Sequence, residues 1–194
     1  MTERYRMDHY VQGYYKSNKP LLQFDPDMKS EEFFQWKEKV IKKARELLQF
    51  PKPFEPVVNF ISKTQRQGYR IEKYEIMPEE GCWVPFLVLI PDHVDNRCKA
   101  PLVMCCPGSA TPKETLCGED FIDFSYEPSG DQYHFPFANA QALHFVRQGM
   151  VAVVSDNPGT GEQTGTYDRS QLSLKLIAKG RNYVGVTVLQ RKTI

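Results

Sequence analysis

An α/β fold built around a parallel strand–helix–strand unit is predicted by three features of the sequence. Two short apolar runs, residues 101–106 and 150–155, each end in a loop rich in proline and glycine. Such runs are typical of buried parallel strands, which are apolar on both faces. Between them, residues 137–148 carry apolar side chains at near-helical spacing, and Gly149 ends the segment. In open α/β sheets the carboxyl ends of parallel strands line the ligand crevice, so we expect the two loops to meet there.

The segments on either side of this unit predict a hairpin and two further helices. Residues 68–76 alternate apolar and polar side chains, as a half-exposed antiparallel strand does. A turn at residues 78–81 then leads into an apolar return strand over residues 82–90. After the second parallel strand, helices are expected over residues 170–178 and 182–193.

The N-terminal part of the sequence predicts a helical extension. Residues 30–50 have apolar side chains at helical spacing, with Ser30 placed to cap the first turn. The opposite face is basic but diluted by glutamates, which favours a helix packed on a protein core over one lying on a membrane. Residues 1–29 have little pattern and are expected to form a surface arm. The predicted domains are residues 1–56, the arm and amphipathic helix, and residues 57–194, the α/β portion.

Composition and charge exclude several classes of partner. Of the 194 residues, 41% are hydrophobic and 25% are charged, with a formal net charge of +1. This balance gives no electrostatic footprint for nucleic acid or an anionic membrane, and no apolar run approaches the ~20 residues that span a bilayer. The five cysteines include adjacent Cys105 and Cys106, which cannot readily pair within a strand. Buried reduced thiols and a reducing compartment such as the cytoplasm are favoured, although an exported protein supplied without its signal would look the same.

Two glycine-rich segments imitate nucleotide-binding motifs without meeting their requirements. Residues 159–165 have the spacing G-x-G-x-x-x-G, one residue longer than the dinucleotide fingerprint, and no helix is expected to begin within them. Residues 108–115 lack the second glycine of a P-loop, and a proline precedes Lys113. No group of His, Cys and acidic residues has zinc spacing. We therefore expect neither a cofactor nor a metal ion, and a nucleotide-binding domain is the weaker alternative.

The loop after the first parallel strand has the composition of an oxyanion-binding loop. Acyl transfer needs preorganised backbone N–H donors for the oxyanion, and small residues let the backbone approach the substrate. Gly108, Ser109 and Ala110 follow Pro107 and fit this role, with the amides of Ser109 or Ala110 expected as donors. The whole loop, residues 107–137, is too long to be a simple connection.

Four features follow one another along the chain: the helix with Phe33 and Trp36, the hairpin, the loop from Pro107 to Glu114, and the turn Asp156–Glu162. This succession resembles bacterial α/β-hydrolases of the acetyl xylan esterase-like and dienelactone hydrolase-like family. The resemblance implies a partial α/β-hydrolase sheet, made of an N-terminal antiparallel hairpin and the parallel βαβ unit, with an N-terminal helical extension. It also implies a serine carboxylic-ester hydrolase whose substrate is a small-molecule ester or a carbohydrate ester of the acetyl xylan type.

The resemblance also indicates what this sequence lacks. The nucleophilic serine of such a fold lies on a Gly-x-Ser-x-Gly elbow after the next strand, and no such motif occurs in the 194 residues. Ser109 sits between Gly108 and Ala110 but precedes the crossover helix and forms no strand-to-helix elbow, and Ser155, at the end of a strand, lacks the flanking glycines. No catalytic residue is therefore expected in this chain, and the serine elbow, the aspartate and the histidine are expected beyond Ile194. The chain alone is predicted to be inactive as an esterase.

Further residues are expected to form or support the crevice. The expected crevice wall consists of Asp156, Gly159, Gly161 and His134. An aspartate at a strand end often caps the following turn, and this is the role favoured for Asp156. Lys113 and Glu114 are expected to pair or cap locally, as part of the scaffold.

The implied order of the sheet carries one more expectation. With strands in the order first, second, fourth, third, fifth, a missing fifth strand leaves the strand at residues 101–106 uncovered. An apolar strand edge favours pairing with another chain, so self-association through this edge is expected. The alternative function from another class is a complete, non-catalytic binding or interaction module.

Overall fold

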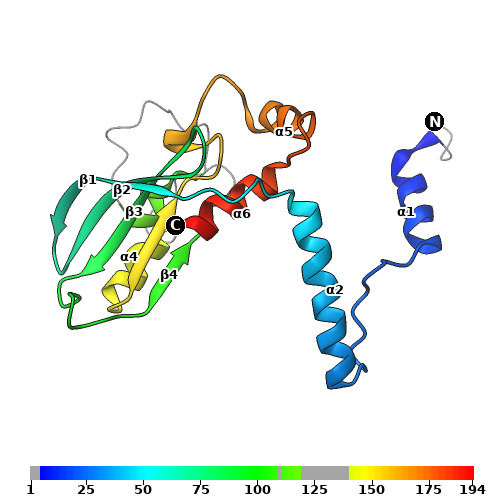
Figure 1. The fold of residues 1–194 in the computed structure, drawn as a ribbon, viewed down its shortest axis with the longest axis horizontal. Helices are drawn as coiled ribbons and strands as arrows, with labels where there is room; N and C mark the ends of the chain where they lie inside the picture. Colours follow the sequence, from blue (N-terminus) through cyan, green and yellow to red (C-terminus); the bar gives the residue numbers. More distant parts are fainter. Residues whose placement is uncertain (1–4, 109–110, 119–139) are drawn as a thin grey trace. The chain divides into compact units, whose positions relative to one another are not determined.

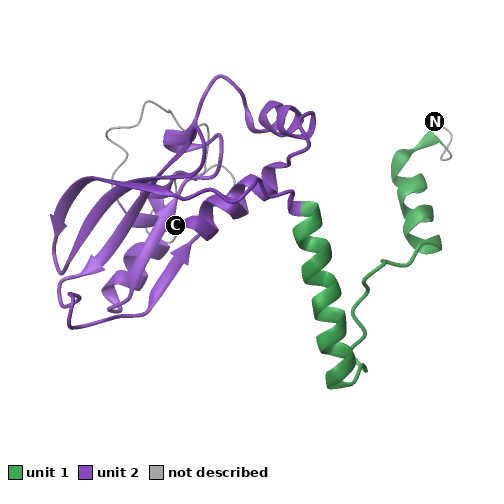
Figure 2. Ribbon diagram, in the orientation of Figure 1, with its two compact units in different colours: residues 1–47 green, residues 48–194 purple. Residues whose placement is uncertain are grey.

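The protein is described by a computed structural model that covers residues 5–108, 111–118 and 140–194. The chain forms two compact units, residues 1–47 (unit 1) and residues 48–194 (unit 2), coloured separately in Figure 2. The sequence placed a boundary after residue 56, and both divisions leave the whole sheet in one unit.

Unit 1 consists of helical segments. It holds α1 (Met7–Ser17) and all but the last residue of α2 (Ser30–Leu48). α1 was not expected from the sequence, because its residues carry no clear apolar period; none of them is buried. Its end is capped by Asn18, whose side-chain amide donates to the carbonyl of Tyr14 over 2.9 Å. Ser30 is the first helical residue of α2 and not its cap as predicted, because the carbonyl of Lys29 accepts the first helical bond. Trp36 on α2 donates to the carbonyl of Leu22 over 3.2 Å.

Unit 2 is built on one five-stranded sheet (Figure 1). Its strands are β1 (Val57–Arg66), β2 (Tyr69–Glu79), β3 (Cys82–Pro91), β4 (Leu102–Cys105) and β5 (Val151–Ser155). The order across the sheet is β1-β2-β3-β5-β4, and the pair β4–β5 is parallel while the other pairs are antiparallel. The predicted hairpin and the predicted parallel unit are both present, with the second parallel strand between the hairpin and the first.

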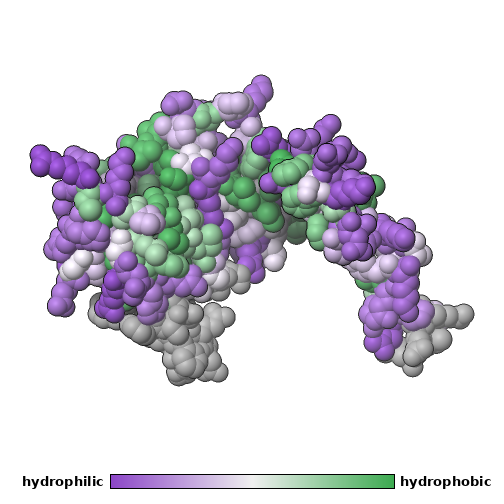
Figure 3. Space-filling model, turned by 90° about the horizontal axis from the view of Figure 1, so that it is seen from below, coloured by the Kyte–Doolittle hydropathy of each residue, from purple (hydrophilic) through white to green (hydrophobic). Residues whose placement is uncertain are grey.

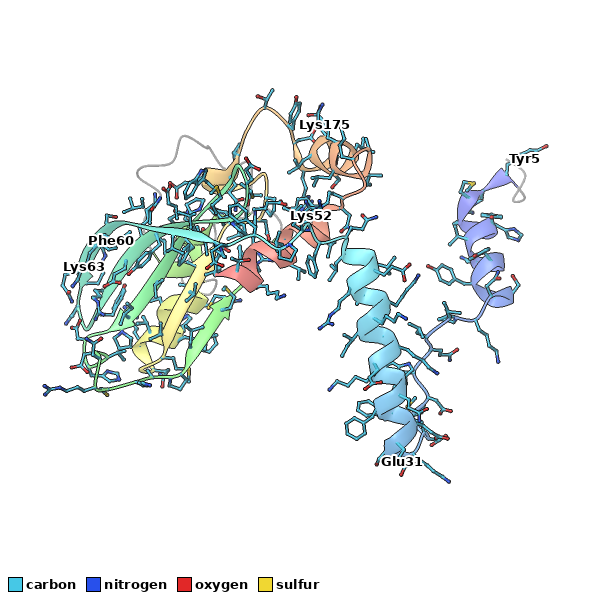
Figure 4. All side chains as sticks on the ribbon, in the orientation of Figure 1. Tyr5, Glu31, Lys52, Phe60, Lys63 and Lys175 are labelled. Atoms are coloured by element: carbon cyan, nitrogen blue, oxygen red, sulfur yellow. The ribbon has the colours of Figure 1, made fainter. Side chains whose placement is uncertain are left out.

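The strand β1 was missed by the sequence reading. Its apolar residues come in neighbouring pairs, Val57 with Val58 and Phe60 with Ile61, so they do not alternate with polar ones. A register shift between Phe60 and Ser62 leaves Ile61 without a partner on β2, and such a bulge breaks the two-residue period. Phe60, labelled in Figure 4, is exposed on this outer strand.

The helices of unit 2 lie largely where the sequence predicted them. They are α3 (Lys113–Cys117), α4 (Gln141–Arg147), α5 (Arg169–Ile177) and α6 (Tyr183–Thr193), with the short 3-10 turn η3 (Gly161–Gln163). α5 begins with a capping box, in which Asp168 and Gln171 each bond the other's backbone. Asn182 caps α6 by accepting from the backbone N–H of Gly185 over 2.7 Å. α3 was unexpected, since it falls in the segment predicted to be a loop, and so was η3, because no helix was expected to begin within residues 159–165.

Apolar side chains are buried on both faces of the sheet. Leu87 and Leu89 of β3 pack with α3 and α4 on one face, and Phe86, which precedes Leu87 in β3, points to the other. Ala152, Val153 and Val154 of the internal strand β5 are all buried, which explains why this run is apolar without alternation.

The cysteines follow the prediction only in part. All five are free thiols, and Cys105 and Cys117 are buried as expected. Cys98 and Cys106 are exposed instead, because Cys98 lies in a surface turn and Cys106 lies just beyond the end of β4.

The surface of unit 2 is mixed. Figure 3 shows hydrophobic patches among hydrophilic residues there, and the exposed apolar residues include Val58 and Ile61 on β1 and Leu102 on β4. β1 and β4 are thus the two edge strands, and each has exposed apolar side chains. Within the described ranges, no helix combines the length and the apolar character needed to cross a bilayer.

The edge at β4 gives a first prediction. Val151 donates its backbone N–H to the carbonyl of Pro101 over 2.8 Å, so residue 101 faces β5. Because successive backbone groups in a strand point to alternate sides, the amides of Val103 and Cys105 also face β5, whereas those of Leu102 and Met104 face the edge. We expect the amide hydrogens of Leu102 and Met104 to exchange faster in dilute solution than those of Val103 and Cys105.

The same measurement tests the expected self-association. Protection of Leu102 and Met104 that grows with protein concentration is the result expected if the chain pairs through this edge. Equal protection of all four amides at every concentration would contradict an open edge at β4.

Candidate functional site

The loops after β4 and β5 lie against each other at one end of the sheet. The side-chain amide of Asn157 donates to the carbonyl of Gly108 over 3.0 Å and to that of Pro107 over 3.3 Å. The chain also turns at this point, because the backbone N–H of Thr111 donates back to Gly108 over 3.3 Å. The predicted meeting of the two loops is therefore present at Gly108.

The described residues include only part of the predicted oxyanion loop and crevice. Ser109 and Ala110 of the loop and His134 of the crevice wall lie outside them. Asp156 and Gly159 lie in the loop that follows β5, and Gly161 is the first residue of η3.

Asp156 is the centre of the contacts between the two loops. Its carboxylate is fully buried and accepts the backbone N–H of Lys113 over 2.8 Å and that of Glu162 over 3.1 Å. The bond to Glu162 closes the turn after β5, which is the capping role predicted for Asp156. The same carboxylate also pairs with Nζ of Lys113 over 2.8 Å, a contact across 43 positions of sequence.

Lys113 is a buried cation surrounded by acids. Its side chain is fully buried, and besides Asp156 it pairs with Glu114 over 2.7 Å and with Glu162. Lys73 of β2 pairs with Glu162 over 2.5 Å from the outside. The local pairing of Lys113 with Glu114 was predicted, but the participation of Lys73 was not, because nothing in the spacing of the sequence connects β2 to this loop.

Burial and the neighbouring charges shift the pKa values of Lys113, Glu114 and Glu162. Burial alone would lower the pKa of Lys113, but Asp156 and Glu114 outweigh burial and raise it, so Lys113 stays charged. Burial would raise the pKa of Glu162, yet its bonds to Lys113 and Lys73 bring that pKa below the usual value. For Glu114, burial prevails over the opposing effect of Lys113, and its pKa is raised. Three carboxyl groups thus share two cations, and burial disfavours the charge of Glu114.

Gly161 is required by the close approach of Asp156. Its φ of +53° lies in the left-handed region, and a Cβ there would stand 2.3–2.6 Å from the carboxylate atoms of Asp156. Any side chain at this position would collide with the group that holds the loops together. Gly161, one of the glycines that imitate a nucleotide motif, is therefore explained by the ion cluster.

Helix α6 holds the second loop from its other side. Tyr183 donates its hydroxyl to the carbonyl of Pro158 over 2.9 Å, and Arg191 donates from Nη2 to Oδ1 of Asn157 over 2.5 Å. These two α6 residues are eight positions apart, about two helical turns, so they share one face of the helix. The sequence reading did not detect this role of α6.

The described residues of the two loops form a hydrogen-bonded framework. Ser155 is buried, and its hydroxyl has no hydrogen-bond partner among them, so no base is present to activate it. Within the same ranges, no group of three or more His, Cys, Asp and Glu side chains could hold a metal ion. What the site can supply chemically is a set of fixed backbone groups at the turn after β4.

Comparison with known proteins defines the class. Residues 4–194 match the Abhydrolase family, and the chain therefore belongs to this family of α/β-hydrolases. No curated protein matches it. Among solved structures, the chain is similar to one called a "putative acetyl xylan esterase" from Bacteroides fragilis NCTC 9343, with a TM-score of 0.80 and 33% sequence identity. The match covers 97% of this chain and 49% of that protein, so the chain spans about half of that protein's length.

Two further structures are more distant. One is acetyl xylan esterase 1 from Thermoanaerobacterium sp. JW/SL YS485, with 16% identity and a TM-score of 0.41 over 65% of this chain and 32% of that one. The other is the acetyl xylan esterase from Paenibacillus sp. R4, with 14% identity and a TM-score of 0.36 over 77% of this chain and 39% of that one.

The buried cluster gives a prediction about stability. Replacing Lys113 by Met leaves buried carboxylates without their central cation, and breaking a buried pair in this way costs about 3–5 kcal/mol. We expect urea unfolding of Lys113→Met to show a loss of this size. The control Lys99→Met changes an exposed lysine and should stay within about 0.5 kcal/mol of the unmodified protein. A Lys113→Met protein as stable as this control would contradict the account.

Glu162 gives a prediction about pH. Because its pKa is lower in the folded protein, its charge stabilises the fold above its ordinary pKa of 4.5, and this contribution is lost as the pH falls through the lowered value. Glu162 is partly exposed, so Glu162→Gln should cost only about 1 kcal/mol at pH 7, and the difference should shrink towards pH 3. Thermal melts at both pH values measure this, with the exposed Glu55→Gln as control. A loss from Glu162→Gln that is the same at both pH values would be inconsistent with the charge pairing.

Proposed function

We propose that this chain supplies the oxyanion loop of a serine carboxylic-ester hydrolase that removes acetyl groups from carbohydrates. The observation that supports the proposal most is the anchored turn at Gly108, at the carboxyl end of β4 in a member of the Abhydrolase family. In an acyl-transfer enzyme this position provides backbone donors for the oxyanion. The choice of an acetylated carbohydrate rests on the similarity to the Bacteroides fragilis protein.

In the proposed reaction, a serine hydroxyl attacks the acetyl carbonyl carbon while a histidine takes its proton. The carbonyl oxygen becomes negatively charged, and backbone N–H groups in the segment of Gly108, Ser109 and Ala110 stabilise it. Collapse of this intermediate releases the carbohydrate hydroxyl with the proton from the histidine, and water then frees acetate from the acyl-enzyme. The serine, histidine and aspartate of this scheme have no counterpart among the motifs of the 194 residues, so we propose that they lie outside this sequence.

Expression of the 194-residue chain and of the entire open reading frame that encodes it tests the proposal. We expect the product of the whole reading frame to release acetate from acetylated xylo-oligosaccharides and to hydrolyse 4-nitrophenyl acetate. The 194-residue chain should do neither above the rate in buffer, because it lacks an activated nucleophile.

Three outcomes would contradict parts of this proposal. An inactive product of the whole reading frame would exclude ester hydrolysis of these substrates. Activity of the 194-residue chain that Ser109→Ala abolishes would place the nucleophile in this chain. A reading frame that ends at residue 194, with an inactive product, would favour a non-catalytic binding module.

A further inference from the structure

The backbone groups of Gly108 are engaged unequally. Its carbonyl accepts two hydrogen bonds, from the side chain of Asn157 and from the backbone of Thr111. Its N–H has no hydrogen-bond partner within the described ranges, and the residue is exposed. The exposed N–H of Gly108, next to a carbonyl fixed by two hydrogen bonds, can therefore donate to a ligand.

The direction of this N–H follows from the preceding peptide group. The carbonyl of Pro107 points at Asn157, whose side-chain amide donates to it over 3.3 Å. No described peptide bond is cis, and in a trans peptide the C=O and the following N–H point in opposite directions. The N–H of Gly108 therefore points away from Asn157 and from the loop after β5.

The orientation of the Asn157 side chain is itself determined by its partners. Its Nδ2 faces two carbonyl groups, which can only accept, and its Oδ1 faces the guanidinium of Arg191, which can only donate. The reversed amide would place donor against donor and acceptor against acceptor. Asn157 is also buried, so water cannot easily replace either set of bonds.

Arg191 acts on the loop through Asn157 alone. Among the described residues, Asn157 is the one hydrogen-bond partner of the Arg191 side chain, whose Nε is buried without an acceptor. Tyr183 on α6 donates its hydroxyl to the carbonyl of the next residue, Pro158, which gives this helix a second contact with the loop.

From these contacts we infer that Asn157 is a positioning residue, which aims the Gly108 N–H at the substrate oxyanion, and that Arg191 holds Asn157 in the orientation this requires. This role rests on the proposed function, because only a reaction that develops an oxyanion would use the donor. It also selects the N–H of Gly108 as a donor in the loop, whereas the sequence favoured the amides of Ser109 or Ala110.

Asn157→Asp separates positioning from folding. An aspartate keeps an oxygen for Arg191, with which it forms an ion pair, but it cannot donate to the carbonyls of Pro107 and Gly108 and repels them. We therefore expect some loss in the free energy of unfolding, offset in part by the ion pair with Arg191, while the turn at Gly108 shifts. Asn96→Asp, the same substitution at an exposed turn, is the matched control. If Asn157→Asp does not fold, Asn157→Ala removes the donors without adding charge and should shift the turn in the same direction.

The first measurement is kinetic and uses the product of the whole reading frame. A donor displaced from the oxyanion stabilises the transition state less without weakening substrate binding, so kcat should fall on the order of 10²-fold with KM nearly unchanged. Asn96→Asp should leave both unchanged. Arg191→Met should lower kcat alone, and it should lower kcat much less when Asn157→Asp is already present, because both changes act on one contact.

The second measurement needs no catalysis and uses the 194-residue chain. The backbone amide resonance of Gly108 in a nitrogen–proton correlation spectrum should move in Asn157→Asp and in Arg191→Met, and it should stay in place in Asn96→Asp. If no ester is hydrolysed but the resonance moves as expected, the proposed function fails and the positioning of Gly108 by Asn157 and Arg191 is supported. An unmoved resonance, or a kcat that Asn157→Asp leaves unchanged in an active enzyme, would overturn the inference.

Discussion

The buried pair between Lys113 and Asp156 is the interaction on which the rest of the site depends. Two charges removed from water are costly, and the arrangement is stable because Asp156 also accepts two backbone N–H groups while Lys113 meets two further acids. Lys113 opens the helix after the first loop, and Asp156 directly follows β5. One ion pair thus joins the loops of two neighbouring strands and dictates a glycine at residue 161.

Two consecutive residues, Asp156 and Asn157, bind the two ends of the loop that follows β4. Asp156 fixes its far end at Lys113 through charge, and Asn157 fixes its near end at Pro107 and Gly108 through carbonyl bonds. The segment between these points contains the small residues that the sequence assigned to oxyanion binding. Backbone donors are effective in acyl transfer when they are fixed before the reaction, and Gly108 lies at one of these two anchored ends.

The sequence predicted the parts of the fold that follow from local pattern. The hairpin, the parallel unit and α6 were visible because apolar periods and Pro/Gly loops report burial directly. β1 was not visible because a bulge at Ile61 interrupts its period. At the site, the sequence found the Gly108 turn and the cap by Asp156, whereas the roles of Lys73 and Arg191 depend on contacts between distant segments that no local spacing encodes.

The most direct test of the central claim is a double-mutant cycle between Lys113 and Asp156, followed by urea unfolding of the 194-residue chain. If the two side chains stabilise the loops as one pair, Lys113→Met and Asp156→Asn should be strongly non-additive, with a coupling energy of about 0.5–3 kcal/mol. The double variant should then lose clearly less stability than the sum of the single losses. Losses that add to within about 0.3 kcal/mol would contradict the claim that this ion pair joins the two loops.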